Sequence, residues 1–451
     1  MESVEGVIGL EGQYRARTQK SFNMFQEASK SLPGGVAGNG KFLEPYPIYV
    51  RNARGAKLWD IDGNEYVDLL MGAGVHILGH SPMPVLDAVK RQLEKGVHYY
   101  TPAEVEVKLA KKVCQLMTAI DMVRFVNTGS ESTQMALRTA RAYRKKDRIG
   151  KFEGNFHGQH DSVLISTLST AGDANNLLPN IDSAGIPKSS AQDVLILPYN
   201  DIDGTLSSIR KDADNLGAVI IEPVSAFGLG CIPADGEFLK AVREITMEND
   251  IPLIFDEVVT NFRLALGGAT EFFGVKPDLV CLGKILGGGF PIGGYGGRRD
   301  IMEKMVTPKT GLWDLKEQIF QSGCFSGNPI SMTAGLAVLE ELEKKNTYPH
   351  LSSLTDSLRD GMSELGEKFN NDLLVTGVAS MLQIHFGVKE IRNKRDALKA
   401  DKSMAKRFHL GLRAKGIMAS AHPLFVSTKH TEEEVNHILE VAEIVLKEME
   451  I

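Results

Sequence analysis

The stretch Pro252–Gly297 organises the rest of this chain, and it reads PLIFDEVVTNFRLALGGATEFFGVKPDLVCLGKILGGGFPIGGYGG. It contains two short apolar runs, Leu253–Phe255 and Leu279–Leu282, which predict adjacent buried strands. An acid, Asp256, follows the first run, and a lysine, Lys284, follows the second. The separation leaves room for a crossover connection, which makes the two strands parallel and places both polar side chains at the carboxyl edge of the sheet.

That edge is where open α/β sheets bind their ligands. A lysine and an acid placed side by side there suit pyridoxal phosphate, which needs an amine for its aldehyde and an acid for its ring nitrogen. An ordinary ion pair is the alternative explanation for these two residues alone. The glycines that cluster after Lys284 predict a close approach of the backbone to a ligand.

The composition is that of an ordinary globular protein, with 451 residues, a net charge of −6, 43% hydrophobic and 24% charged residues. The mild acidity argues against a nucleic-acid-binding surface, and no apolar run is long enough for a membrane span or a signal core. The four cysteines are far apart and predict reduced thiols in a cytoplasmic protein. They are Cys114, Cys231, Cys281 and Cys324.

The order of the elements predicts an α/β fold with a mainly parallel sheet. We expect strands near residues 123, 163, 195, 219, 253 and 279, separated by helices. We expect one helix over residues 1 to about 35, then a small β-meander, and a final helix that begins at a capping box of Thr431 and Glu434. The predicted domains are an N-terminal segment (1–75) that joins the small domain, a large α/β domain (76–330) and a C-terminal small α+β domain (331–451).

Two further stretches carry candidate site residues. The run Asn127–Glu131 predicts a strand, a glycine turn and a helix N-terminus, which can bind an anion or merely cap the helix. The run Lys151–His160 predicts a glycine-rich loop with two histidines. We expect no metal there, because no further ligands follow at a suitable spacing. The polar stretch 167–192 predicts a long loop, of a length that is often functional.

Six motifs in order resemble the class III pyridoxal-phosphate aminotransferases, and within them the glutamate-1-semialdehyde aminomutases and the β-amino-acid aminotransferases. The resemblance covers roughly residues 20–445. The motifs are Asn127-Thr-Gly-Ser-Glu-Ser-Thr133, Phe152-Glu-Gly-Asn-Phe-His-Gly158, Glu222-Pro-Val, Asp256-Glu-Val, Cys281-Leu-Gly-Lys284-Ile-Leu-Gly-Gly-Gly and Phe325-Ser-Gly-Asn-Pro329.

The resemblance implies a fold-type I homodimer with its active site at the subunit interface and pyridoxal 5′-phosphate as the cofactor. It implies that Lys284 forms the Schiff base and that Asp256 pairs with the pyridine nitrogen. The other implied cofactor contacts are Phe156 and Val258 on the two ring faces, His157 beside the ring, Glu222 near the ring hydroxyl, and Gly129 and Ser130 at the phosphate, with Gly323 and Cys324 of the other subunit.

The chain also departs from the aminomutase pattern. Gly38 and Lys41 stand where that pattern has a serine and an arginine for the substrate carboxylate, and Ala73 stands where it has tryptophan. Phe227 replaces an asparagine and Cys324 replaces a threonine.

These departures favour an aminotransferase that moves an amino group from an amine or (β-)amino acid to a keto acid or aldehyde. The aminomutase, a racemase or epimerase, and a non-catalytic binding protein are the alternatives. The aromatic residues Phe227, Tyr99 and Tyr100 hint at an apolar side-chain pocket, and a carboxylate partner could be Lys41, Arg263 or His422.

Overall fold

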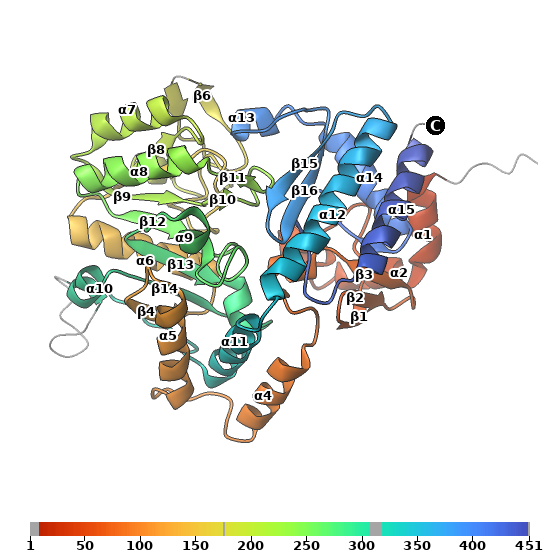
Figure 1. Ribbon diagram of the computed structural model, residues 1–451, viewed down its shortest axis with the longest axis horizontal. Helices are drawn as coiled ribbons and strands as arrows, with labels where there is room; N and C mark the ends of the chain where they lie inside the picture. Colours follow the sequence, from red (N-terminus) through yellow and green to blue (C-terminus); the bar gives the residue numbers. More distant parts are fainter. Residues whose placement is uncertain (1–8, 175, 307–317, 450–451) are drawn as a thin grey trace, which may run out of the picture.

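The computed structural model describes residues 9–174, 176–306 and 318–449. Its largest sheet has seven strands in the order β4-β14-β13-β12-β9-β5-β8 (Figure 1). Their bounds are β4 Met122–Val126, β14 Gly293–Gly297, β13 Leu279–Gly283, β12 Leu253–Asp256, β9 Leu216–Ile221, β5 Arg148–Phe152 and β8 Val194–Leu197. Every pairing is parallel except those of β14, which is antiparallel to both of its neighbours. The predicted pairing of β12 with β13 is confirmed, with Asp256 opposite Cys281.

Helices cover both faces of this sheet, as the alternation of its buried side chains requires. On one face Val219 and Ile221 of β9 pack with α8 (Gly236–Glu248). On the other face Ala218 and Ile220 of β9 pack with α6 (Gly129–Arg144). The central strands are buried along their whole length, which is why they read as unbroken apolar runs.

A second group of elements combines the two ends of the chain (Figure 1). The meander of β1 (Val50–Arg54), β2 (Lys57–Asp60) and β3 (Glu65–Asp68) is extended by β17 (Ile417–Met418), which pairs with β3 in parallel. Nearby elements are β15 Leu373–Val378, β16 Met381–Phe386, β18 Leu424–Phe425, α12 Thr347–Lys368, α14 Lys402–Ala414 and α15 Glu432–Met449. This pairing supports our proposal that the N-terminal segment belongs with the C-terminal domain.

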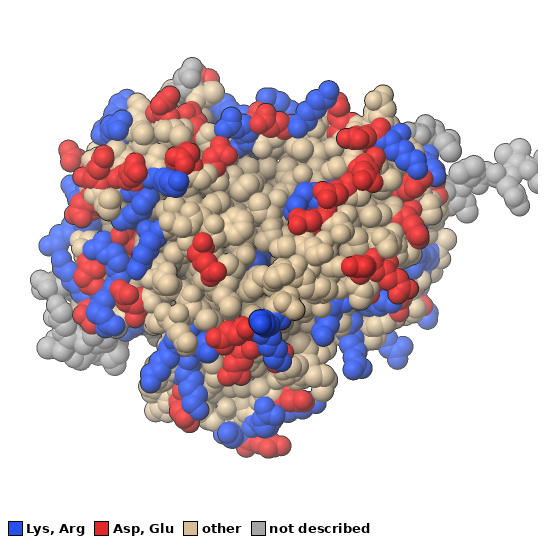
Figure 2. Space-filling view, viewed as in Figure 1, with Lys and Arg blue, Asp and Glu red and all other residues tan. Residues whose placement is uncertain are grey.

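The final helix, α15, begins as its capping box predicts. The Glu434 amide donates to the Thr431 hydroxyl at 3.2 Å, and the Thr431 amide donates to the Glu434 carboxylate at 3.0 Å. None of the helices in the described part of the chain is long and apolar enough to cross a membrane. Figure 2 shows acidic and basic side chains interspersed over one face of the molecule, in keeping with the small net charge.

Two predicted elements are wrong. The strand expected near residue 163 is not in the sheet, because Val163 and Ile165 are buried in an irregular segment that makes only an isolated bridge to Ile181. The strand at this place in the sheet is β5. Its sequence, Arg-Ile-Gly-Lys-Phe, contains a glycine and two charged residues, so it does not form an apolar run. The first helix is two helices, α1 (Leu10–Arg17) and α2 (Gln19–Ala28), because the backbone leaves the helical region at Thr18. Residues 1–8 of the predicted helix lie outside the described residues.

The predicted loop over residues 167–192 is mostly irregular, as expected. It also contains a short hairpin of β6 (Ala171–Asp173) and β7 (Asn176–Leu178) and a short 3-10 turn.

Candidate active site

Asp256 and Lys284 lie at the carboxyl ends of neighbouring strands and line one cavity of about 240 Å³. Asp256 is the last residue of β12, and Lys284 follows β13 directly with a positive φ of 47°. The amine of Lys284 donates to the Ala73 carbonyl at 3.0 Å. Burial and the positive charge of Arg263 lower the pKa of this amine, although Asp256 and Glu222 act in the opposite direction. Lys284 therefore loses its proton more readily than a free lysine does.

His157 and a backbone amide hold the Asp256 carboxylate in place. Its Nδ1 lies 2.8 Å from Asp256 Oδ2, and the amide of Val258 donates to the other carboxylate oxygen at 3.1 Å. Burial lowers the pKa of His157 despite the acid beside it, so the ring is neutral and Nδ1 carries the proton that it donates. Two donors thus hold a buried acid at the end of the cavity.

Glu222 is a second buried acid in the same cavity. Its carboxylate accepts from the Phe156 amide at 2.7 Å and from the Ser225 hydroxyl at 3.2 Å. Burial, with the charge of Asp256 nearby, raises the pKa of Glu222 to about 8. At neutral pH the cavity therefore contains one carboxyl that keeps its proton.

The N-terminus of α6 forms another wall, where Gly129 and Ser130 begin the helix. The Thr128 side chain caps the helix by accepting from the Glu131 amide at 3.1 Å. Gly158 passes so close that a Cβ on it would lie 2.6 Å from the Ser130 hydroxyl oxygen. The amides of the first helical turn and the helix dipole make this end of the cavity suitable for a phosphate.

Apolar side chains line the remaining walls. Val258 packs against Gly129, where an added Cβ would lie 2.8 Å from its Cγ1. On the other side the ring of Phe156 lies 5.1 Å from that of Phe227. The ring of Phe227 in turn stacks on His422, with 5.0 Å between their centroids.

The cavity brings together eight of the ten residues that the sequence predicted for the site: Gly129, Ser130, Phe156, His157, Glu222, Asp256, Val258 and Lys284. Gly323 and Cys324 are exposed and do not line it. Sequence reasoning missed Thr128, Thr133, Gly158 and Val259, which also line the cavity. Each lies within two residues or one helical turn of a predicted site residue. Closeness in sequence to the predicted residues could therefore have identified them.

The glycines after Lys284 have a different role from the predicted one. None of Gly287, Gly288 and Gly289 lines the cavity. An added Cβ on Gly288 would lie 2.7 Å from Val338 of α11 (Pro329–Leu342), so this glycine admits a packed helix. Lys41, Tyr99 and Tyr100 are exposed and do not line the cavity either.

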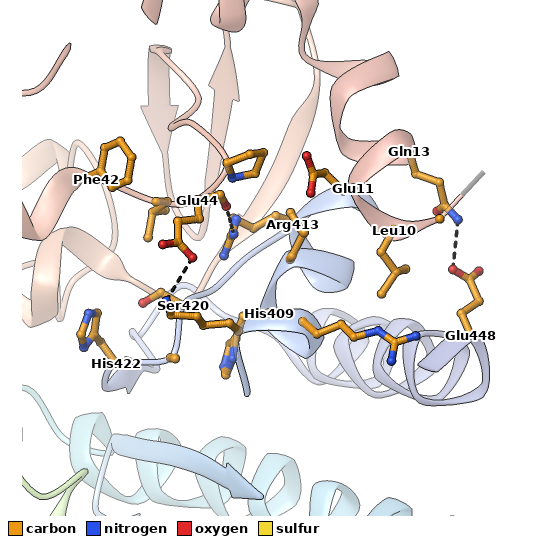
Figure 3. Close-up of a pocket in the computed structure, with 17 residues that line it drawn as sticks. Leu10, Glu11, Gln13, Phe42, Glu44, His409, Arg413, Ser420, His422 and Glu448 are labelled. Atoms are coloured by element: carbon orange, nitrogen blue, oxygen red, sulfur yellow. Dashed lines mark hydrogen bonds and ion pairs between the residues drawn. The ribbon is translucent and has the colours of Figure 1, made fainter. Parts of the chain in front are cut away.

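A larger cavity of about 760 Å³ lies beside α1 and α14 (Figure 3). Several of its charged groups are already paired: Lys406 with Glu44 at 3.1 Å, and Arg413 with the Glu44 carbonyl at 2.8 Å. It holds no strand-terminal acid and lysine. His422 lines it and stacks on Phe227 of the smaller cavity, so the two cavities are neighbours.

Comparison with known proteins identifies the class of protein. Residues 41–441 match the family model of the class III aminotransferases. A glutamate-1-semialdehyde 2,1-aminomutase from Methanosarcina acetivorans is 44% identical over 424 residues, which cover 93% of this chain and 97% of that protein. An omega-transaminase structure from Sphaerobacter thermophilus is 33% identical with a TM-score of 0.90, and the match covers 97% and 99% of the two chains. A transaminase structure with pyridoxal phosphate bound is 28% identical with a TM-score of 0.85, covering 95% and 97%.

This chain belongs to the class III aminotransferase family. Enzymes of this family depend on pyridoxal 5′-phosphate, which is the cofactor of this protein. The cavity fits that cofactor, because it combines a lysine, a fixed buried acid and an anion-binding helix N-terminus. The glycine at position 158 leaves this end of the cavity open, since a Cβ there would collide with Ser130.

Proposed function

We propose that this enzyme moves an amino group by means of Lys284, Asp256 and His157 in the 240 Å³ cavity. The observation that carries the proposal is the buried Asp256 carboxylate, which His157 holds at 2.8 Å on the strand next to the one that Lys284 follows. When bound, pyridoxal phosphate supplies an aldehyde that reacts with amines and a ring that withdraws electrons from the reacting carbon.

Each side chain has a task in this proposal. Asp256 keeps a negative charge where the ring nitrogen would lie, and His157 prevents the carboxylate from turning away. Lys284 holds its amine in the form that can take a proton from the substrate carbon and return it. Gly129 and Ser130 would hold the phosphate at the N-terminus of α6.

The curated relatives favour the intramolecular form of this reaction. The Methanosarcina acetivorans relative, which matches nearly the whole chain, is a glutamate-1-semialdehyde 2,1-aminomutase. We therefore place that activity first, which reverses the order favoured by the sequence.

Transfer between two molecules is the second candidate, and the composition of the cavity supports it. Among the described residues that line the cavity, Lys284 is the only lysine or arginine. Glutamate-1-semialdehyde carries a carboxylate, for which a cation is the usual partner. Lys41 stands away from the cavity at the surface, and the Phe156 and Phe227 rings form an apolar wall instead.

One experiment separates the two reactions. Protein reconstituted with pyridoxal phosphate is given glutamate-1-semialdehyde, and separately a panel of amines and β-amino acids, and the cofactor's absorbance and the products are followed. Rearranged product without consumption of an external amine supports the aminomutase. Amination of the cofactor by an external amine supports the aminotransferase. If borohydride does not fix the cofactor to Lys284, the proposed site is wrong.

We also propose that the enzyme is a homodimer in the cytoplasm. Val97, Tyr100 and Phe325 are exposed, and the ring of Phe325 lies 5.0 Å from that of His98, so two apolar segments meet on one surface. Contiguous exposed apolar side chains are typical of interaction sites. Gly323 and Cys324 belong to this surface, which supports a contribution to the cavity of a partner subunit.

A further inference from the structure

Arg263 is fully buried, with 1% of its surface exposed. Among the carboxylates of residues 9–174, 176–306 and 318–449, none forms an ion pair with this guanidinium. Its Nη1 donates to the Ser380 hydroxyl at 2.9 Å, and its Nη2 donates to the Gly74 carbonyl. The central carbon of the guanidinium, Cζ, lies 4.7 Å from the centroid of the Phe425 ring. Buried charges are normally paired, because desolvation of an unpaired charge is costly. This exception therefore calls for a function.

The carbonyl that Arg263 binds belongs to an unusual turn. Met71, Gly72, Ala73 and Gly74 all have positive φ, at 45°, 65°, 57° and 85°. Successive left-handed residues are unfavourable, and two of these four are not glycine. We call Met71–Gly74 the left-handed turn. It is held at its start by the Asp68 carboxylate, which accepts from the Leu70 and Met71 amides at 2.8 and 3.1 Å.

The left-handed turn joins Arg263 to Lys284. The Ala73 carbonyl accepts from the Lys284 amine, and the next carbonyl, that of Gly74, accepts from Arg263. Two cationic side chains therefore bind consecutive peptide groups. The ionisable groups that act on the pKa of Lys284 are Arg263, which lowers it, and the acids Asp256 and Glu222, which raise it when they are ionised. Cys231 and Tyr348, which face Arg263, have raised pKa values from burial and are neutral, so they do not cancel its charge.

We propose that Arg263 is a positioning residue for Lys284: it fixes the left-handed turn through Gly74 and places a positive charge without a paired carboxylate one peptide group away from the carbonyl that binds the Lys284 amine. The inference rests on the proposed role of Lys284. Burial lowers the pKa of Arg263 only to about 10, so the guanidinium stays charged at neutral pH. A positive charge near Lys284 favours the loss of the proton from its amine. The amine must lose this proton before it can attack an aldehyde.

The test uses the cofactor-free protein and therefore does not depend on activity. Lys284 is labelled with acetic anhydride over a range of pH, and the labelled peptide is quantified by mass spectrometry. Removal of the charge by Arg263→Met should raise the midpoint pH of labelling by about one unit or more. Arg263→Lys keeps the charge and should keep the wild-type midpoint. An equal shift of the labelling midpoint in Arg263→Lys and Arg263→Met would overturn the proposal. A purely structural role of Arg263 predicts that equal shift, because both variants lose the guanidinium.

A second pair of variants covers the case in which Arg263→Met does not fold. Ser380→Asp places a carboxylate against the guanidinium and neutralises it without removing it, since Ser380 already accepts from Arg263. It should raise the midpoint of Lys284 labelling, and the neutral control Ser380→Asn should not. Equal midpoints for the Asp and Asn variants would contradict the inference. Failure of borohydride to fix the cofactor to Lys284 would instead refute the proposed function and leave the labelling result unaffected.

Discussion

At the scale of single residues, burial sets the charge of the site. It lowers the pKa of Lys284 and His157 and raises that of Glu222, so each of these groups is shifted toward its neutral form. The Asp256 carboxylate accepts hydrogen bonds from His157 and from the Val258 amide, which fix its orientation in the cavity. A carboxylate held in this way is placed to stabilise a protonated ring nitrogen.

Glu222 gives a prediction about stability and pH. Its pKa is about 8 in the folded protein and about 4.3 in an unfolded chain, so the folded state binds the extra proton between these values. Wild-type stability should therefore fall as pH rises through this window, while Glu222→Gln, which has no such proton, should escape the loss. The gain of the variant should reach on the order of 4 kcal/mol near pH 8.

Thermal unfolding of the cofactor-free proteins from pH 4.5 to 9 would measure this difference. Glu94→Gln, at the exposed C-terminal end of α4 (Met83–Leu93), is the control for a carboxyl at the surface. If the wild-type and Glu222→Gln curves run parallel over the whole range, Glu222 does not hold a proton in the fold.

At the scale of elements, the proposed phosphate end of the cavity is shaped by the close approach of Gly158 to α6. Gly158→Ala places a Cβ within 2.6 Å of Ser130 Oγ at a φ of 99°. We expect the displaced Ser130 to weaken cofactor binding at least about tenfold, since the loss of one charge-assisted hydrogen bond is worth about 1.5–3 kcal/mol. Titration of the cofactor-free protein with pyridoxal phosphate measures this.

Gly185→Ala is the matched control, because Gly185 has a φ of 91° and nothing within 4 Å of its missing Cβ. Both variants strain the backbone, but only one collides with the helix. Equal loss of cofactor affinity in the two variants would show that strain alone is responsible, and the assigned phosphate end would be wrong.

The sequence predicted those elements whose own chemistry specifies them. Strands β12 and β13 are apolar runs, and the capping box marks the start of α15. Strand β14 was not predicted, because its sequence is Gly-Gly-Tyr-Gly-Gly. Its glycines are explained only by tertiary contacts: a Cβ on Gly293 would lie 2.1 Å from the Thr128 carbonyl oxygen, and one on Gly297 would lie 2.1 Å from that of Asp278. Intrinsic strand propensity does not report such constraints.

At the scale of the whole molecule, the sequence predicted most of the residues that line the candidate cavity, because they occur in recognisable motifs at strand ends. It did not reveal the left-handed turn or the buried Arg263, since both depend on contacts between segments about 117 to 189 residues apart. It also could not specify which exposed apolar side chains would form the proposed dimer interface, since exposed apolar atoms are common on monomers too.

The proposed dimer makes a prediction that cysteine chemistry can check. In the single chain Cys324 is exposed, whereas Cys231 and Cys281 are buried. If the surface around Phe325 and Tyr100 is the dimer interface, Cys324 should be protected from iodoacetamide in the native protein. Tyr100→Glu puts a charge on a side chain that is 85% exposed in the single chain, where it should not affect folding.

That variant should dissociate the dimer, expose Cys324 to alkylation and reduce turnover at low protein concentration. Sedimentation velocity gives the oligomeric state, and peptide mass spectrometry gives the alkylated cysteine, with Cys231 and Cys281 as unreactive references. Met247→Glu on α8 is the control, because Met247 is also well exposed, at 62%, but belongs to a different element. A native protein that is monomeric and alkylated at Cys324 would exclude this interface, and with it the contribution of Gly323 and Cys324 to a shared site.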